Sequence, residues 1–116
     1  MIGHTADMEA TKAAVRIVDK CAYAIAMGTL ITGGECIITA DHGNAEELLD
    51  ANGQPKTSHT TSPVPFVIVG DKQRTLAPQG ELANVAPTIL EMMGIEIPPE
   101  MTKSLLVPNP IKKIKK

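Results

Sequence analysis

The segment that decides the fold is Ile37–Asn44, with the sequence Ile-Ile-Thr-Ala-Asp-His-Gly-Asn. An apolar, β-branched run bounded by turn residues is typical of a short buried strand, so we expect a strand that ends just before Asp41 and His42. Gly43 frees the backbone to turn after this strand. Because ligands of open α/β sheets bind at the carboxyl ends of the strands, two polar side chains lie where a site is expected.

Asp41 and His42 are candidate ligands of a cation. Neighbouring strand residues point to opposite faces, but the backbone leaves β geometry here, and both side chains can then reach one ion. A carboxylate with a neutral imidazole suits borderline divalent ions such as zinc, manganese or iron. The alternative for His42 is a hydrogen-bonded loop residue. His4 and His59 lie in loop-like sequence far from this segment; each is either a solvated loop residue or a ligand that the fold brings to the same site.

The composition restricts the classes of function. The 116 residues, 43% of them hydrophobic, support one small domain or a piece of a larger one. Only 2% are aromatic and the net charge is −2, which disfavours nucleic-acid and anionic-membrane partners. There is no apolar run long enough to span a bilayer, and we expect no signal peptide because no basic stretch is followed by an apolar one at the start of the sequence. Cys21 and Cys36 form no CxxC pair, so we expect buried, reduced thiols in a cytoplasmic protein.

Helical periodicity predicts an amphipathic helix that ends at Gly33-Gly34, with Thr5 as its N-cap. This helix leads directly into the strand that starts at Cys36, which is half of a βαβ unit. The apolar face of the predicted helix consists of Ala14, Ile17, Val18, Cys21, Ala24, Ile25 and Gly28.

The remaining sequence predicts a second strand and a second helix. We expect a short helical turn at 45–50, a strand at 66–69 and a surface loop at 70–80. Asn84 is the expected N-cap of the second helix and Gly94 its end. The predicted fold is therefore α/β, in the order helix, strand, loop, strand, helix.

Two other kinds of site have little support in the sequence. A Ser-His-Asp site that uses Ser58 or Ser104 is disfavoured because no GxSxG elbow follows a strand. A phosphate-binding loop is disfavoured because Gly33-Gly34 precedes a strand rather than a helix.

Five segments of this sequence, taken together and in this order, resemble one enzyme family. They are Met-Ile-Gly-His-Thr (1–5), Thr-Ala-Asp-His-Gly-Asn (39–44), Ser-His-Thr-Thr-Ser-Pro-Val-Pro-Phe (58–66), Leu-Ala-Asn-Val-Ala-Pro-Thr-Ile-Leu (82–90) and Met-Thr-Lys-Ser-Leu (101–105). The set resembles the C-terminal end of the cofactor-independent (2,3-bisphosphoglycerate-independent) phosphoglycerate mutases, which are alkaline-phosphatase-like metalloenzymes. The resemblance covers residues 1–107, and the basic, mobile tail expected at 108–116 lies outside it.

The resemblance implies part of a three-layer α/β/α domain and a site for two divalent ions, typically manganese. In the family, a serine accepts the phosphoryl group from 3-phosphoglycerate and returns it to the 2-position of glycerate. By motif, His4 and His59 match ligands of one ion, and Asp41 and His42 match ligands of the other. Asn44, on position alone, is expected to contact a ligand rather than an ion.

The family pattern also includes parts that match no residue of this sequence. These are the nucleophilic serine, two aspartate ligands and the inserted substrate domain. The resemblance therefore assigns no catalytic residue here, and we expect the isolated chain to lack mutase activity. An uncovered sheet edge makes self-association an expectation. Two other interpretations stay open: another superfamily enzyme, such as a phosphopentomutase or a metal-dependent phosphatase, and a non-catalytic metal-binding or self-associating module.

Overall fold

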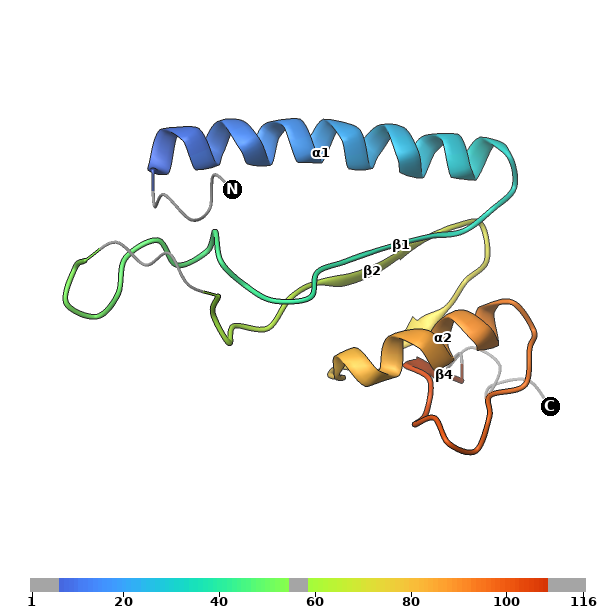
Figure 1. Cartoon of the computed structure of the whole chain (residues 1–116). Helices are drawn as coiled ribbons and strands as arrows, with labels where there is room; N and C mark the ends of the chain where they lie inside the picture. Colours follow the sequence, from blue (N-terminus) through green and yellow to red (C-terminus); the bar gives the residue numbers. More distant parts are fainter. Residues whose placement is uncertain (1–6, 55–58, 109–116) are drawn as a thin grey trace. The chain divides into compact units, whose positions relative to one another are not determined.

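The computed structural model describes residues 7–54 and 59–108. The chain divides into two compact units, Met1–Asp71 and Lys72–Lys116. The division expected at residue 107, between a metalloenzyme domain and a basic tail, stays a prediction because 109–116 lie outside the described residues. The elements in chain order (Figure 1) are α1 (Met8–Ile31), β1 (Cys36–Thr39), β2 (Phe66–Val69), β3 (Thr75–Leu76), the 3₁₀ helix η2 (Leu82–Asn84), α2 (Val85–Met92) and β4 (Leu106–Val107).

The termini of α1 follow from local hydrogen bonding. Asp7 is the N-cap, since its Oδ1 accepts a hydrogen bond from the backbone N–H of Ala10 at 3.0 Å. The prediction that Thr5 caps the helix is therefore wrong, because the helix begins after Asp7. Gly33 follows the helix with a φ of 81°, a conformation that glycine adopts without strain, so the predicted end of the helix is confirmed.

The face of α1 that packs on the strands differs from the predicted one. Thr11 and Ala26 are buried, whereas Ile17 and Val18 of the predicted apolar face are 63% and 65% exposed. Small side chains such as Ala26 let the helix approach β1, and apolar residues occur on more than one side of this helix. Cys21 is also exposed, so the prediction that it is buried is wrong. Both Cys21 and Cys36 are free cysteines.

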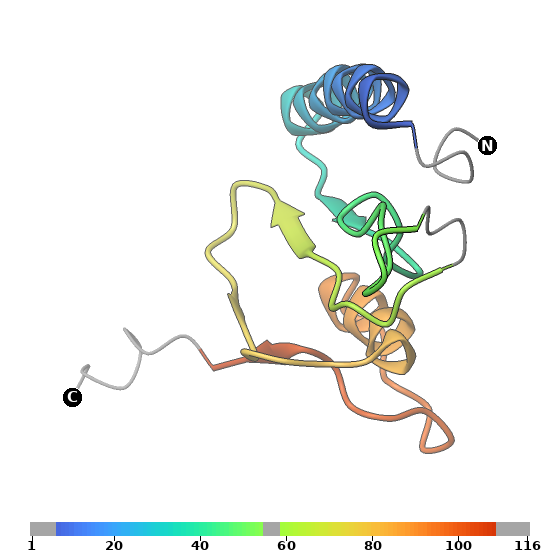
Figure 2. The same ribbon diagram turned by 90° about the vertical axis from the view of Figure 1, so that its left-hand side faces the viewer.

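The first sheet consists of β1 and β2, which run antiparallel alongside α1 (Figures 1 and 2). Cys36 pairs with Val69 and Thr39 with Phe66, and the Thr39 hydroxyl donates to the Pro65 carbonyl at 2.8 Å. Because the two strands are antiparallel, β2 is not the parallel partner of a βαβ unit, and the prediction that α1 and β1 are half of such a unit stays a prediction. The strand expected to be buried is only half-buried along Cys36–Ile38 and exposed at its end.

Two predictions about the connecting segments are wrong. Residues 45–50 form a turn and extended backbone rather than a helical turn, because the Asn44 N–H donates to the Glu46 carboxylate at 2.8 Å. A side chain that binds nearby backbone competes with helix formation. The predicted loop at 70–80 contains β3, which pairs antiparallel with β4. The predicted strand at 66–69 is confirmed.

In the second unit, Asn84 is the N-cap residue of α2, as predicted, but its side chain organises the preceding 3₁₀ helix. Its side-chain oxygen accepts from the Glu81 N–H at 2.6 Å, and its amide donates to the Lys103 carbonyl at 2.9 Å. Its side chain makes no capping bond to α2. The helix ends as predicted at Gly94, where φ is 72°. None of the helices in the described part of the chain is long and apolar enough to cross a membrane.

Thr88 connects α2 to the segment that leads into β4. Its side chain is fully buried, and its hydroxyl donates to the Asn84 carbonyl at 2.6 Å and accepts from the Leu105 N–H at 2.8 Å. A buried N–H that loses its acceptor is not compensated by water. The packing of this unit therefore depends on one hydroxyl group.

We expect Thr88→Val to lower the free energy of unfolding by about 1–3 kcal/mol, because it leaves the Leu105 N–H buried without an acceptor. Urea denaturation followed by circular dichroism measures the loss. The control is Thr102→Val, which makes the same change at an exposed position of this unit and should change stability by less than about 0.5 kcal/mol. Equal effects of the two variants would contradict this role for Thr88.

Candidate metal centre

The candidate site lies where the loop after β1 meets the segment before β2. Gly43 and Thr60 form an isolated antiparallel bridge, in which the Thr60 N–H donates to the Gly43 carbonyl at 2.9 Å. His42 precedes Gly43 and His59 precedes Thr60 in the chain. The bridge therefore brings together two histidines that the sequence places 17 residues apart.

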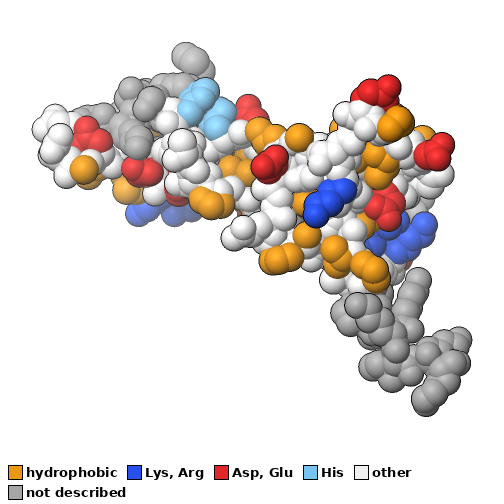
Figure 3. All heavy atoms as spheres, turned by 90° about the horizontal axis from the view of Figure 1, so that it is seen from below, with side chains coloured by type: hydrophobic (Ala, Val, Ile, Leu, Met, Phe, Trp, Pro, Cys, Tyr) orange, Lys and Arg blue, Asp and Glu red, His pale blue; other side chains and the backbone are white. Residues whose placement is uncertain are grey.

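The imidazole rings of His42 and His59 are stacked. Their centroids are 3.5 Å apart and their planes differ by 9°. The histidines of the described residues form one pale blue patch at the surface in Figure 3. The expectation that the fold brings these two histidines together is confirmed, while His4 lies outside the described residues.

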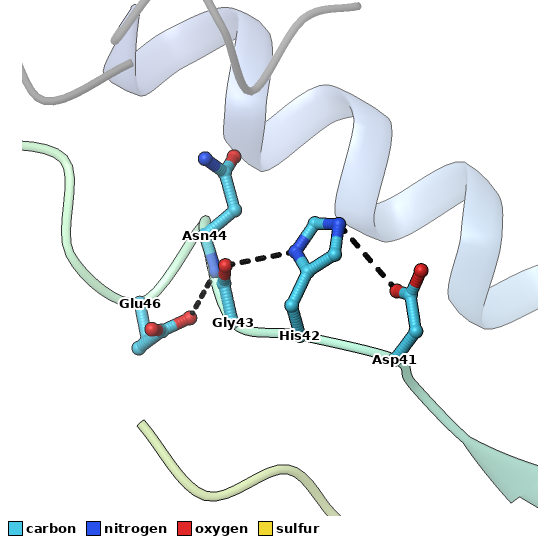
Figure 4. A network of polar contacts seen from close by, with 5 residues as sticks. All are labelled: Asp41, His42, Gly43, Asn44 and Glu46. Atoms are coloured by element: carbon cyan, nitrogen blue, oxygen red, sulfur yellow. Dashed lines mark hydrogen bonds and ion pairs between the residues drawn. The ribbon is translucent and has the colours of Figure 1, made fainter. Parts of the chain in front are cut away.

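The hydrogen bond of His42 fixes its tautomer. Nδ1 lies 3.0 Å from the Gly43 carbonyl oxygen, which only accepts hydrogen bonds, so Nδ1 carries the proton (Figure 4). In the neutral ring, Nε2 is then the atom with a free lone pair, which is the state that a metal ligand requires. Nε2 lies 3.5 Å from Oδ1 of Asp41. These two atoms are the donors that the sequence predicts for one ion.

The two donors of this pair differ in exposure. The Asp41 side chain is 84% exposed and that of His42 is 34% exposed. A carboxylate oxygen and an imidazole nitrogen suit a borderline divalent ion. Within residues 7–54 and 59–108, no group of three or more His, Cys, Asp or Glu side chains is placed to hold a metal ion. The donor chemistry of this pair therefore fits a divalent ion, but the pair alone is not a complete set of ligands among the described residues.

The stacked arrangement also bears on how many ions the histidines can hold. The lone pair of an imidazole nitrogen lies in the plane of the ring. Because the planes of His42 and His59 are nearly parallel and stacked, their lone pairs do not converge on one point. The two rings, as placed, do not aim their lone pairs at a single ion.

Glu46 is the residue of this site that the sequence analysis missed. One carboxylate oxygen accepts from the Asn44 N–H at 2.8 Å, and the other accepts from the Thr60 hydroxyl. The Thr60 hydroxyl, with smaller contributions from nearby backbone N–H groups and Ser62, lowers the pKa of Glu46 from 4.5 to about 2. The available signal was an acidic residue close after the Asp-His pair. As for Asn44, the predicted contact with a ligand stays a prediction, and its backbone contacts Glu46 (Figure 4).

Gly43 has a different role from the predicted one. Its φ is not positive, unlike that of Gly33 or Gly53, so the backbone does not need glycine in order to turn here. A Cβ atom at Gly43 would instead collide with the Thr60 hydroxyl and the Glu46 carboxylate. The absence of a side chain is what allows the two segments to approach each other.

Comparison with known proteins identifies the group to which this site belongs. The model of the metalloenzyme superfamily matches residues 1–97. The chain belongs to this superfamily. A divalent metal at the site agrees with this membership, whereas the identity and number of the ions are not given by it.

Within the superfamily, the similar proteins are phosphoglycerate mutases. The chain is 46% identical over 110 residues to the 2,3-bisphosphoglycerate-independent phosphoglycerate mutase of Hahella chejuensis, a match that covers 94% of the chain and 21% of that enzyme. It is 50% identical over 103 residues to the enzyme of Escherichia coli strain K12, covering 88% of the chain and 20% of that enzyme. The chain thus spans about a fifth of the length of these relatives.

A solved structure shows the same fold. The crystal structure of Leishmania mexicana phosphoglycerate mutase at low cobalt concentration matches with a TM-score of 0.82 and 33% identity, over 93% of this chain and 23% of that one. The resemblance stated from the sequence and the predicted α/β, alkaline-phosphatase-like fold are confirmed by this match and by superfamily membership.

We expect Gly43→Ala to destabilise the protein by about 1–3 kcal/mol, because the added methyl group has no space between Thr60 and Glu46. Gly28→Ala is the matched control: nothing lies within 4 Å of a Cβ there, and alanine favours a helix by up to about 1 kcal/mol. Urea denaturation of both variants measures the difference. If Gly43→Ala were as well tolerated as Gly28→Ala, the close approach at Gly43 would be wrong.

We expect Thr60→Val to raise the pKa of Glu46 from about 2 toward 4.5, since it removes the largest cause of the lowering. Because the folded pKa lies below the usual value, the stabilisation from Glu46 is fully present above pH 4.5 and is lost as the pH falls toward 2. Carboxyl ¹³C NMR titration reads the pKa directly. Thr61→Val is the control and should leave the pKa of Glu46 near 2. A pKa that stays near 2 in Thr60→Val would contradict the assignment of the lowering to the Thr60 hydroxyl.

Proposed function

We propose that this chain supplies part of the metal centre of a 2,3-bisphosphoglycerate-independent phosphoglycerate mutase, the glycolytic isomerase that interconverts 3-phosphoglycerate and 2-phosphoglycerate. The observation that carries the proposal is the stack of His42 on His59, with the Asp41 carboxylate beside His42. The identity to mutases of 46% and 50% supports it. Phosphoglycerate is accordingly the proposed substrate of the whole enzyme.

In this proposal, Asp41 and His42 hold one divalent ion, and His59 together with His4 holds the other. The stack of the two rings supports ligation of separate ions, because the in-plane lone pairs of two nearly parallel rings do not converge on one point. The ions, manganese in our proposal, would stabilise negative charge on the attacking and leaving oxygens of phosphoryl transfer when bound. The Gly43 carbonyl keeps the proton of His42 on Nδ1, so that Nε2 stays available as a ligand.

No residue of this chain is proposed as the nucleophile. The motifs that this sequence shares with the mutases contain metal ligands, and neither the nucleophilic serine nor the substrate domain has a counterpart in them. Asp41, His42, His59 and His4 give each ion two protein ligands, fewer than the usual number of about three. We therefore propose weak metal binding and no mutase activity for these residues alone.

The test is a titration of the chain with manganese, in which isothermal titration calorimetry measures the binding. We expect binding that His42→Ala weakens by about tenfold or more, because one of two donors to its ion is removed, equivalent to about 1.4 kcal/mol. Asp19→Ala, which removes an exposed carboxylate from α1, should bind as the wild type does. Equal binding by all three proteins would overturn the ligand role of His42.

A mutase assay tests the second part of the proposal. With 3-phosphoglycerate and manganese present, the isolated chain should form no 2-phosphoglycerate above the level of a no-protein control. A full-length mutase such as the Escherichia coli relative serves as the positive control. Turnover by the chain at the rate of that enzyme would show that the catalytic group lies within these residues.

The exposed apolar surface favours a second property, self-association. Ile17, Val18 and Ile25 of α1 are all more than 60% exposed, and β1 and β2 form a two-stranded sheet within the described part of the chain. Open strands and contiguous apolar faces are sites of association. We propose a cytoplasmic protein that self-associates through these surfaces and that binds neither nucleic acid nor membranes, in keeping with its net charge of −2.

A further inference from the structure

Glu46 connects the two segments that carry the stacked histidines. Its Oε1 accepts from the Asn44 N–H at 2.8 Å, which fixes the carboxylate within the loop after β1. Its Oε2 accepts from the Thr60 hydroxyl, which belongs to the segment before β2. One side chain thus joins the loop of His42 to the segment of His59.

Thr60, which donates to Glu46, is placed so that its position determines that of His59. Thr60 is buried, its N–H donates to the Gly43 carbonyl, and its hydroxyl also accepts from the Ser62 N–H at 3.4 Å. The backbone and the side chain of Thr60 are therefore both fixed. Because His59 immediately precedes Thr60, a shift of Thr60 moves the ring of His59 relative to that of His42.

The backbone hydrogen bond between Thr60 and Gly43 does not by itself determine which residues of the two segments lie opposite each other. An isolated bridge has no neighbouring strand pairs to hold it, so a side chain that spans the same two segments adds a second point of attachment. Glu46 passes directly over Gly43, where a Cβ atom would strike it. The absence of a side chain at Gly43 therefore leaves the space that the Glu46 carboxylate occupies.

We propose that Glu46 is a positioning residue, which holds His42 and His59 in the stacked arrangement by tying Thr60 to the loop after β1. It does not contact the ions in this proposal and acts through the two histidines. The inference that this arrangement serves metal binding rests on the proposed function, whereas the positioning itself is a property of the protein without metal.

The test compares three variants in the absence of metal. Nuclear Overhauser effects between the ring protons of His42 and His59 report the stack, and circular dichroism reports the overall fold. Glu46→Ala should lose these cross-peaks while it keeps the helical signal. Glu46→Gln should retain them, because its carbonyl can accept from Asn44 N–H and its amide can donate to the Thr60 hydroxyl. Asp19→Ala is the control and should retain them.

Manganese titration of the same proteins adds the functional readout. Glu46→Ala should bind manganese about tenfold more weakly than the wild type, as is typical when a group that orients a ligand is removed, and Glu46→Gln should restore the affinity. If Glu46→Ala does not fold, Glu46→Asp takes its place, since its side chain is one methylene shorter and does not span both partners.

Two results distinguish the positioning role of Glu46 from the proposed metal function. Cross-peaks that persist unchanged in Glu46→Ala, or in Glu46→Asp where the alanine variant does not fold, would overturn the positioning role. A wild-type chain that shows the cross-peaks but binds no manganese would overturn the proposed metal function, and a loss of cross-peaks in Glu46→Ala would still establish the positioning role.

Discussion

The candidate metal centre is built on the isolated bridge between Gly43 and Thr60, in which the Thr60 N–H donates to the Gly43 carbonyl. The same carbonyl oxygen accepts from Nδ1 of His42, so a single acceptor joins the two segments and also selects the tautomer of the neutral ring. The ring of His59 is placed by its neighbour Thr60. The proximity of two distant histidines is thus a direct consequence of an isolated bridge that forms after the end of β1 and before the start of β2.

The site shows how much can be predicted from local sequence and where local sequence is insufficient. The position of Asp41 and His42 at the end of a strand follows from an apolar β-branched run and is confirmed. From the residues alone, the approach of His59 was one of two open alternatives, because no local pattern encodes a pairing across a polar segment; the resemblance to a family favoured it. Glu46 and Thr60 were missed for the same reason: their hydrogen bond joins residues 14 positions apart.

The errors in the fold have physical causes that differ from one element to another. At 45–50, the carboxylate of Glu46 accepts from the Asn44 N–H, and a local bond of this kind competes with helix formation. β3 and β4 are two-residue strands, too short to show an alternating pattern. The orientation of α1 was wrong because apolar residues occur on several sides, so that the sequence does not specify which side contacts the sheet. The exposure of Ile17 and Val18 is the basis of the proposed self-association.

Hydrogen exchange of the Thr60 backbone amide, measured by NMR in the chain without metal, tests most directly whether the bridge to Gly43 holds the site. If it does, this amide exchanges far more slowly than the same amide in an unstructured peptide of the same sequence. Exchange at the rate of the unstructured peptide would contradict the bridge, because the Thr60 N–H would then not be held on the Gly43 carbonyl.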